Sequence, residues 1–219
     1  MAMITENVQR VLKCVPEGVT VLAAAKTRTL EMVREAYQAG LRHVGHNYVQ
    51  EAAAMIPAMR EDIHWHMIGH LQRNKAKVAV ELFSMIDSVD SQRLADELEK
   101  QALQSEKLLP VMIEVNIGEE EAKSGIEPDL AFQLARHIQG LAHLRLVGIM
   151  TMGPLAEDAE DSRTYFRKTR MLYELIKREM PDVNYLSMGM SHDYLVAIEE
   201  GANMIRLGTA IFGERAKNR

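Results

Sequence analysis

Short apolar runs alternate along the chain with longer amphipathic segments. The first apolar run, residues 19–25, predicts a β-strand, and the apolar spacing of residues 30–39 predicts a helix that ends at Gly40. The same alternation continues to the end of the chain. Further strands are predicted at residues 43–45, 63–68, 83–86, 110–116, 144–150, 184–187 and 203–207. Further helices are predicted at residues 48–59, 74–80, 92–104, 128–138, 160–179 and 193–199.

This regular alternation predicts parallel strands, because each helical crossover must return the chain to the same end of the sheet. Eight strand segments with intervening helices predict an α/β fold, a single (β/α)8 barrel of the TIM type. A doubly wound open sheet is the alternative. No stretch rich in Pro, Gly or Ser is longer than a turn, so residues 1–219 are read as one domain, with residues 153–161 as the best candidate for a mobile loop.

Composition and charge narrow the class of protein. Hydrophobic residues make up 47% and charged residues 26% of the 219 residues, which is typical of a globular protein and excludes a fibrous or disordered chain. The net charge of −5 argues against a general nucleic-acid binder. Cys14, the one cysteine, suits a reducing compartment. No signal peptide or run of about 18 apolar residues is visible, which predicts a cytoplasmic protein with no membrane partner.

A lysine follows the first predicted strand directly. In a barrel of this type, functional groups lie at the carboxyl ends of the strands. Lys26 would lie at that end, where partial desolvation lowers the pKa of an ammonium group and favours a Schiff base with an aldehyde or ketone. The alternative is a lysine that leaves the strand into solvent, and position alone favours that alternative.

Two glycine-containing loops at the end of the chain favour the functional interpretation of Lys26 over the solvent-exposed one. Residues 187–191 follow the seventh strand and residues 206–210 follow the eighth, and both loops combine glycine with Ser or Thr. Backbone N–H groups at glycine and side-chain hydroxyls are donors for an anion, and these two loops commonly bind phosphate in barrel enzymes. A lysine together with a phosphate site describes a protein that holds pyridoxal 5′-phosphate, PLP.

The motifs that carry this chemistry also carry a resemblance. They lie at residues 21–27, 45–51, 65–75, 115–117, 123–125, 186–191 and 206–213. In this order, and over nearly the whole chain, the sequence resembles the pyridoxal phosphate homeostasis protein family. That family is similar to the amino-terminal domain of alanine racemase.

The resemblance implies a set of cofactor-binding residues. Lys26 would hold PLP as an internal aldimine, and Arg206 would lie beside the pyridine nitrogen rather than the phosphate. Because arginine stays protonated, it cannot take a proton from the ring, so the cofactor would be a weak electron sink. The remaining implied cofactor residues are Asn47, Met67, Gly69, Ser187, Met188, Gly189, Ser191, Gly208 and Thr209.

Three histidines depart from the family pattern. His46 stands where the family most often has Glu, His70 where proline is usual, and His192 where an acidic residue is usual. Because histidine titrates near neutrality, these residues could change the pH response of the pocket.

A metal site is the alternative function for the histidines between residues 64 and 70. His64 and His66 would share one face of a strand, and His70 would follow in the next loop. No Cys, Asp or Glu joins them at the usual ligand spacing, so we expect no metal. The basic residues Arg73, Lys75 and Lys77 are read as a solvated helix start rather than a nucleic-acid site.

Two functions remain. The first is a PLP-binding protein that stores, buffers or delivers the cofactor without turnover, with PLP-requiring apoenzymes as possible recipients. The second is a PLP enzyme such as an amino-acid racemase, which needs a second base opposite the lysine. In alanine racemase that base is a tyrosine from a separate domain, which this length does not accommodate, and nothing in the sequence places Tyr48 or His46 there. We therefore expect a carrier with no catalytic residues, and the resemblance implies a monomer.

Overall fold

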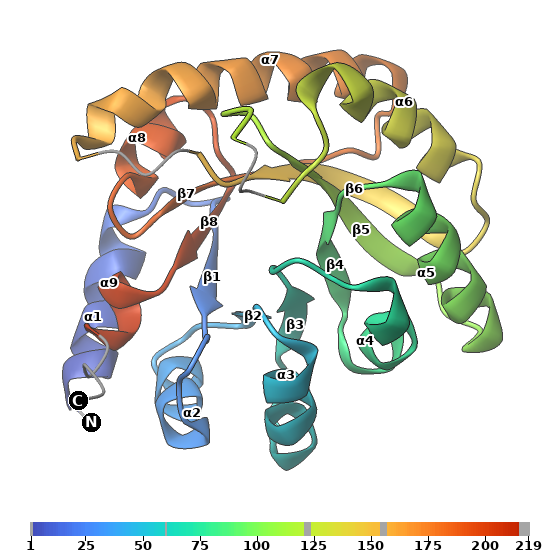
Figure 1. Ribbon diagram of the computed structural model, residues 1–219. Coiled ribbons are helices and arrows are strands. Elements are labelled where there is room, and N and C mark those ends of the chain that lie inside the picture. Colours follow the sequence, from blue (N-terminus) through green and yellow to red (C-terminus); the bar gives the residue numbers. More distant parts are fainter. Residues whose placement is uncertain (1, 60, 121–123, 154–156, 215–219) are drawn as a thin grey trace.

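The computed structural model describes residues 2–59, 61–120, 124–153 and 157–214. Within these residues, eight parallel strands close into a barrel in the order β1 to β8, and the helices surround it (Figure 1). The prediction of a single TIM-type (β/α)8 barrel is therefore confirmed, and the open sheet is excluded. The strands are β1 (Thr20–Ala24), β2 (His43–His46), β3 (His64–Met67), β4 (Met85–Val89), β5 (Leu109–Val115), β6 (Leu144–Thr151), β7 (Tyr185–Met190) and β8 (Met204–Leu207).

The helices follow the strands around the outside of the barrel (Figure 1). The α-helices are α1 (Ala2–Cys14), α2 (Leu30–Gln38), α3 (Val49–Met55), α4 (Ala76–Leu82), α5 (Gln92–Gln104), α6 (Pro128–Gln139), α7 (Arg163–Glu179), α8 (Tyr194–Glu199) and α9 (Thr209–Phe212). Short 3₁₀ helices η1 (Ile56–Ala58), η2 (Arg73–Lys75) and η3 (Ala159–Ser162) extend three of the connections.

Most element boundaries follow from local signals. The helix predicted at residues 92–104 is α5, and the Ser91 hydroxyl accepts a hydrogen bond from the Leu94 N–H at 3.4 Å. The fourth strand lies later than predicted, at Met85–Val89, because Phe83 ends α4 by donating its N–H to the carbonyl of Ala79. Of the predicted loop 153–161, residues 154–156 lie outside the described residues, and η3 begins within the rest.

Barrel closure places the first and last strands side by side. β1 pairs in parallel with both β2 and β8, so Leu22 lies opposite His43 on one side and Arg206 on the other. Helices α1 and α9, from opposite ends of the chain, also lie together (Figure 1), and the Asn7 side chain donates to the carbonyl of Ile211 at 3.0 Å. The loops after β7 and β8 are thereby brought next to the loop after β1.

The apolar core has an inner part and an outer part. The inner part comes from strands and their immediate continuations, and it fills the barrel with Leu22, Ile68, Met112, Val147, Met150 and Met204. The outer part packs the opposite strand faces against the helices. Side chains alternate between the two faces of a strand. Every second residue, counted along a strand from one of these inner residues, therefore also points into the barrel. Among the residues described, none of the helices combines the length and apolar character that a membrane crossing requires.

Candidate functional site

Lys26 lies at the carboxyl end of β1, two residues after the strand. The N–H of Ala25 donates to the Gly45 carbonyl at 2.9 Å, which ties this segment to β2. Thr27 then turns the chain with a φ of 61°, and its N–H donates to Glu51 Oε2 at 3.2 Å. The half-buried Lys26 ammonium lies 5.1 Å from the centroid of the Tyr48 ring. The sequence-predicted lysine is therefore held at the barrel mouth.

Asn47 and Gly69 bring the ends of β2 and β3 together. The N–H of Ile68 donates to the His46 carbonyl at 3.0 Å, just before both strands give way to loops. A Cβ atom at Gly69 would lie 2.5 Å from the Asn47 carbonyl oxygen, so this approach requires glycine. A cavity of about 410 Å³ opens beside the pair, and Tyr48 and Met67 are also among its lining residues.

The loops after β7 and β8 are held together by a serine. The hydroxyl oxygen of Ser191 accepts hydrogen bonds from the N–H groups of Gly208 and Ala210, both at 3.1 Å. Gly189 has a φ of 92°, and a Cβ atom there would lie 2.5 Å from the Cβ of Ala197 in α8. Thr209, the first residue of α9, is exposed beside this connection. The hydroxyl groups of Ser191 and Thr209 are the side-chain donors at this connection.

Arg206 is a buried cation on β8, pointing into the barrel. Its Nη1 donates to Ser187 Oγ at 2.7 Å, and its Nη2 donates to the Thr151 carbonyl at 2.6 Å. Within the part of the chain described, the hydrogen bonds of this guanidinium thus go to uncharged acceptors. Burial lowers the pKa of Arg206, and the negative charges of Asp87, Glu114 and Asp193 oppose that change.

Glu114 is a second buried charged group, on β5. Its Oε1 accepts from the Ser124 hydroxyl at 2.8 Å, whereas Oε2 has no hydrogen-bond partner among the described residues. Burial raises the pKa of Glu114, and the charge of Asp90 adds to this, although the Ser124 hydrogen bond and Arg206 act in the opposite direction.

Two predicted binding residues point away from the barrel interior. Met67 and Met188 are buried in the outer apolar core, between strands and helices. Met67 still lines the 410 Å³ cavity, whereas Met188 is not among the lining residues of that cavity. Sequence patterns could not assign these faces, because strands buried on both sides show apolar residues at both parities.

The three unusual histidines occupy three different environments. His46 is fully buried, and its ring stacks on Trp65 at a centroid distance of 5.7 Å. In the part of the chain that the structure describes, neither ring nitrogen has a hydrogen-bond partner. Burial lowers its pKa, with Glu51 acting in the opposite direction. His70 is exposed, with its Nδ1 3.1 Å from Asp90 Oδ2. His192 is exposed, with its Nε2 3.1 Å from the Glu157 carbonyl.

No group of three or more His, Cys, Asp or Glu side chains suited to a metal ion occurs among the described residues. His66 lies inside the barrel, where its Nδ1 is 3.0 Å from both carboxylate oxygens of Asp87. His70 is engaged with Asp90 instead. His66 and His70 therefore pair with two different aspartates, and His64 stacks on His43 instead.

Sequence reasoning missed several polar groups that support the site. Thr151 supplies a carbonyl to Arg206, and Asp87 lies on the inward face of β4. Asp193 is buried, and it accepts hydrogen bonds from the Met190 N–H at 2.7 Å and the Ser162 hydroxyl at 3.0 Å. A polar residue within an otherwise apolar strand was the available signal for Asp87.

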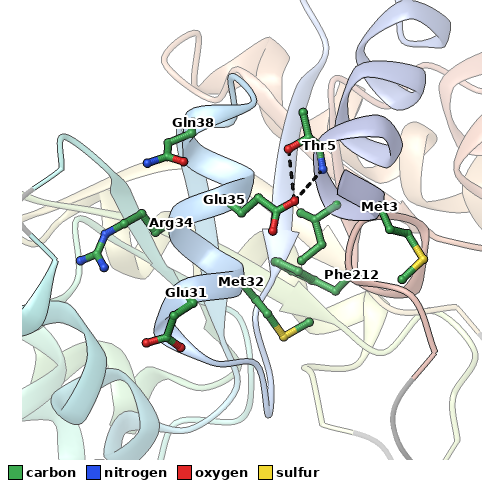
Figure 2. A pocket seen from close by; sticks show the side chains of 9 residues that line it. Met3, Thr5, Glu31, Met32, Arg34, Glu35, Gln38 and Phe212 are labelled. Carbon is green, nitrogen blue, oxygen red and sulfur yellow. Dashed lines mark hydrogen bonds between the residues drawn. The ribbon is translucent and has the colours of Figure 1, made fainter. Parts of the chain in front are cut away.

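A hollow on the outer surface is separate from this site. It has a volume of about 590 Å³ and lies between α1 and α2 near Phe212, where Thr5 donates two hydrogen bonds of 3.2 Å to Glu35 (Figure 2). Met3 and Met32 contribute its apolar wall. As far as the described residues show, none of the predicted cofactor residues lines it.

Comparison with known proteins identifies relatives of this chain. Residues 1–216 match the family model for the alanine racemase N-terminal domain. A pyridoxal phosphate homeostasis protein from Aquifex aeolicus is 41% identical over 220 residues, covering 98% of this chain and 96% of the relative. An alanine racemase of Clostridium difficile shares the fold at 13% identity and a TM-score of 0.81, covering 100% of this chain and 58% of the racemase.

A solved structure gives a closer match in three dimensions. PipY of Synechococcus elongatus, described as a COG0325 family member with PLP bound, is 34% identical with a TM-score of 0.89. The match covers 96% of this chain and 100% of the PipY chain. The chain therefore belongs to the pyridoxal phosphate homeostasis protein family, built on the barrel of the alanine racemase N-terminal domain.

Proposed function

We propose that this protein binds pyridoxal 5′-phosphate and stores, buffers or delivers it in the cytoplasm, as a monomer without substrate turnover. The observation that carries the proposal is the meeting of Lys26 with the donor loops after β7 and β8, which barrel closure makes neighbours. Relatives are named pyridoxal phosphate homeostasis proteins, and PipY was solved with PLP. PLP-requiring apoenzymes are the recipients that this function implies.

The residues present fit the chemical groups of the cofactor. When bound, PLP supplies an aldehyde that condenses with primary amines and a ring that withdraws electrons. Lys26 is the amine at the mouth, and the hydroxyl groups of Ser191 and Thr209 suit a phosphate. Arg206 adds a positive charge whose hydrogen bonds go to uncharged groups, which favours an anionic ligand.

Arg206 also bears on reactivity. A guanidinium donates hydrogen bonds and stays protonated, so beside a ring nitrogen it would donate to that atom and take no proton from it. Ser187 and the Thr151 carbonyl hold the guanidinium in one orientation. The ring withdraws electrons most strongly when its nitrogen is protonated. A ring nitrogen that stays unprotonated beside Arg206 therefore favours holding the cofactor over carbanion chemistry.

A racemase would need a second base, and Tyr48 and His46 are the two residues that could supply it. The position of neither residue supports that role. The Tyr48 ring contacts the Lys26 ammonium itself, at 5.1 Å. His46 is buried against Trp65 on the outer side of β2, and burial disfavours its charged form. A base on the opposite face of a substrate needs a different position from either of these.

The first test is to locate the attachment of the cofactor. Purified protein should carry PLP, and borohydride reduction followed by peptide mass spectrometry should place the adduct on Lys26. Lys26→Ala should abolish the adduct, whereas Lys100→Ala, at a surface lysine near Glu97, should retain it. A covalent adduct of equal yield on the Lys26→Ala protein would refute the assignment.

The second test separates the carrier from the racemase. Protein loaded with PLP is incubated with L-alanine, and the D-isomer is measured by chiral chromatography against free PLP at the same concentration. We expect no D-alanine above that background. Turnover that is lost in Lys26→Ala would establish the enzyme instead.

A further inference from the structure

The turn after β7 is closed by a buried carboxylate. It covers residues 190–193, and the Asp193 N–H donates to the Met190 carbonyl at 3.1 Å. The Asp193 side chain makes the reciprocal contact, because its Oδ1 accepts from the Met190 N–H at 2.7 Å. Two hydrogen bonds therefore join the ends of a turn that contains Ser191.

The second oxygen of the same carboxylate ties the turn to another part of the barrel. Oδ2 of Asp193 accepts from the Ser162 hydroxyl at 3.0 Å, and Ser162 is the last residue before α7. Asp193 is only 6% exposed, and it forms no ion pair with any residue that the structure describes. Burying a carboxylate without a cation costs free energy, and these hydrogen bonds offset part of that cost.

The Asp193 side chain does not serve the helix that it precedes. Asp193 is the N-cap residue of α8, where an aspartate commonly accepts a hydrogen bond from an N–H in the first turn of the helix. Its side chain makes no such hydrogen bond. Both carboxylate oxygens are directed to residues that come earlier in the chain. The carboxylate therefore supports the turn after β7 rather than the start of α8.

The hydroxyl group that this turn holds is left with one hydrogen-bonding function. A serine hydroxyl has two acceptor sites and one donor. The N–H groups of Gly208 and Ala210 fill both acceptor sites of the half-buried Ser191. Among the described residues, none accepts the Ser191 proton. This hydroxyl can therefore only donate, and a phosphate offers the acceptor oxygens that it requires.

We propose that Asp193 is a positioning residue for the phosphate of bound PLP, because it fixes the turn from which the Ser191 hydroxyl donates to a phosphate oxygen. This inference rests on the proposed binding of PLP at the barrel mouth. Asp193 acts through its hydrogen bonds and not through its charge, since a negative charge near an anion opposes binding.

Two substitutions at Asp193 separate position from charge. Asp193→Asn removes the charge but keeps an oxygen for the Met190 N–H and an amide that can donate to Ser162. Asp193→Ala removes both contacts. In a spectrophotometric titration, Asp193→Asn should bind PLP at least as tightly as the wild type, whereas Asp193→Ala should bind about tenfold more weakly, as for one lost hydrogen bond to a charged group. Asp96→Ala, which removes a surface carboxylate 2.6 Å from His137, is the matched control and should follow the wild type.

A double-mutant cycle tests whether Asp193 acts through Ser191. Ser191→Ala should weaken PLP binding by a similar factor, and adding Asp193→Ala should cause no further loss. Amide hydrogen exchange of the cofactor-free protein gives a readout that does not depend on PLP. The N–H groups of Gly208 and Ala210 should exchange slowly in the wild type and in Asp193→Asn, and faster in Asp193→Ala.

The outcomes separate this inference from the proposed function. Losses that add in the double variant, or a tenfold loss of affinity in Asp193→Asn, would overturn the role of Asp193. Should Asp193→Ala fail to fold, the Asp193→Asn affinity and the wild-type exchange rates still decide, because fast exchange at Gly208 and Ala210 in the folded wild type would also overturn it. Absence of PLP binding by the wild type would instead overturn the proposed function.

Discussion

Gly189 provides a direct test of how the end of β7, next to the loop that contains Ser191, is held. Its φ of 92° lies in the left-handed region, and an added Cβ would lie 2.5 Å from the Ala197 Cβ and 3.0 Å from the Tyr194 Cα. Gly189→Ala should cost ~1–2 kcal/mol for the backbone conformation and ~1–3 kcal/mol for overpacking against α8. We expect a total loss of roughly 2–5 kcal/mol in the free energy of unfolding.

Gly18 offers a matched control because it shares the backbone conformation without the contact. Its φ is 88°, and an added Cβ would meet no atom within 4 Å. Gly18→Ala should therefore lose only the ~1–2 kcal/mol of the backbone effect. Urea unfolding followed by the fluorescence of Trp65, the one tryptophan, gives both free energies.

The Gly189→Ala substitution should also change the affinity for the cofactor. If relief of the contact shifts the loop, the affinity for PLP should fall by about tenfold for each ~1.4 kcal/mol that the loop must recover on binding. Gly18→Ala should leave that affinity unchanged. Equal losses of stability in the two variants would refute the close approach of α8, and with it the reasoning that glycine is required there.

Two further substitutions test the buried polar groups. Ser191→Ala removes the acceptor for the Gly208 and Ala210 N–H groups, so we expect a loss of about 1–3 kcal/mol in stability and faster hydrogen exchange at both amides; unchanged exchange would contradict this contact. Glu114→Gln tests how the Glu114 pKa affects the dependence of stability on pH. Burial raises this pKa above its ordinary 4.5. The contribution of Glu114 to the free energy of unfolding is therefore present below pH 4.5 and is lost as pH rises through the folded-state pKa. Unfolding free energies from pH 4.5 to 8 should fall less steeply for the variant, and parallel profiles would contradict the raised pKa.

The sequence alone determined the elements that depend on local signals. The alternation of strands and helices predicted the barrel, and Ser91 and Pro128 marked helix starts that the structure confirms. Lys26 and the glycine-containing loops were also visible locally, because each follows directly after a predicted strand. These features need only neighbouring residues for their recognition.

Tertiary structure alone decided which of these features meet and which faces they use. Barrel closure pairs β1 with β8, and this brings Leu22 opposite Arg206 although 184 residues separate them along the chain (206 − 22). Strands that are buried on both faces carry little information about which face is inside. For that reason, only the closed barrel shows that His46 is buried on the outer face of its strand and that His66 contacts Asp87 inside the barrel.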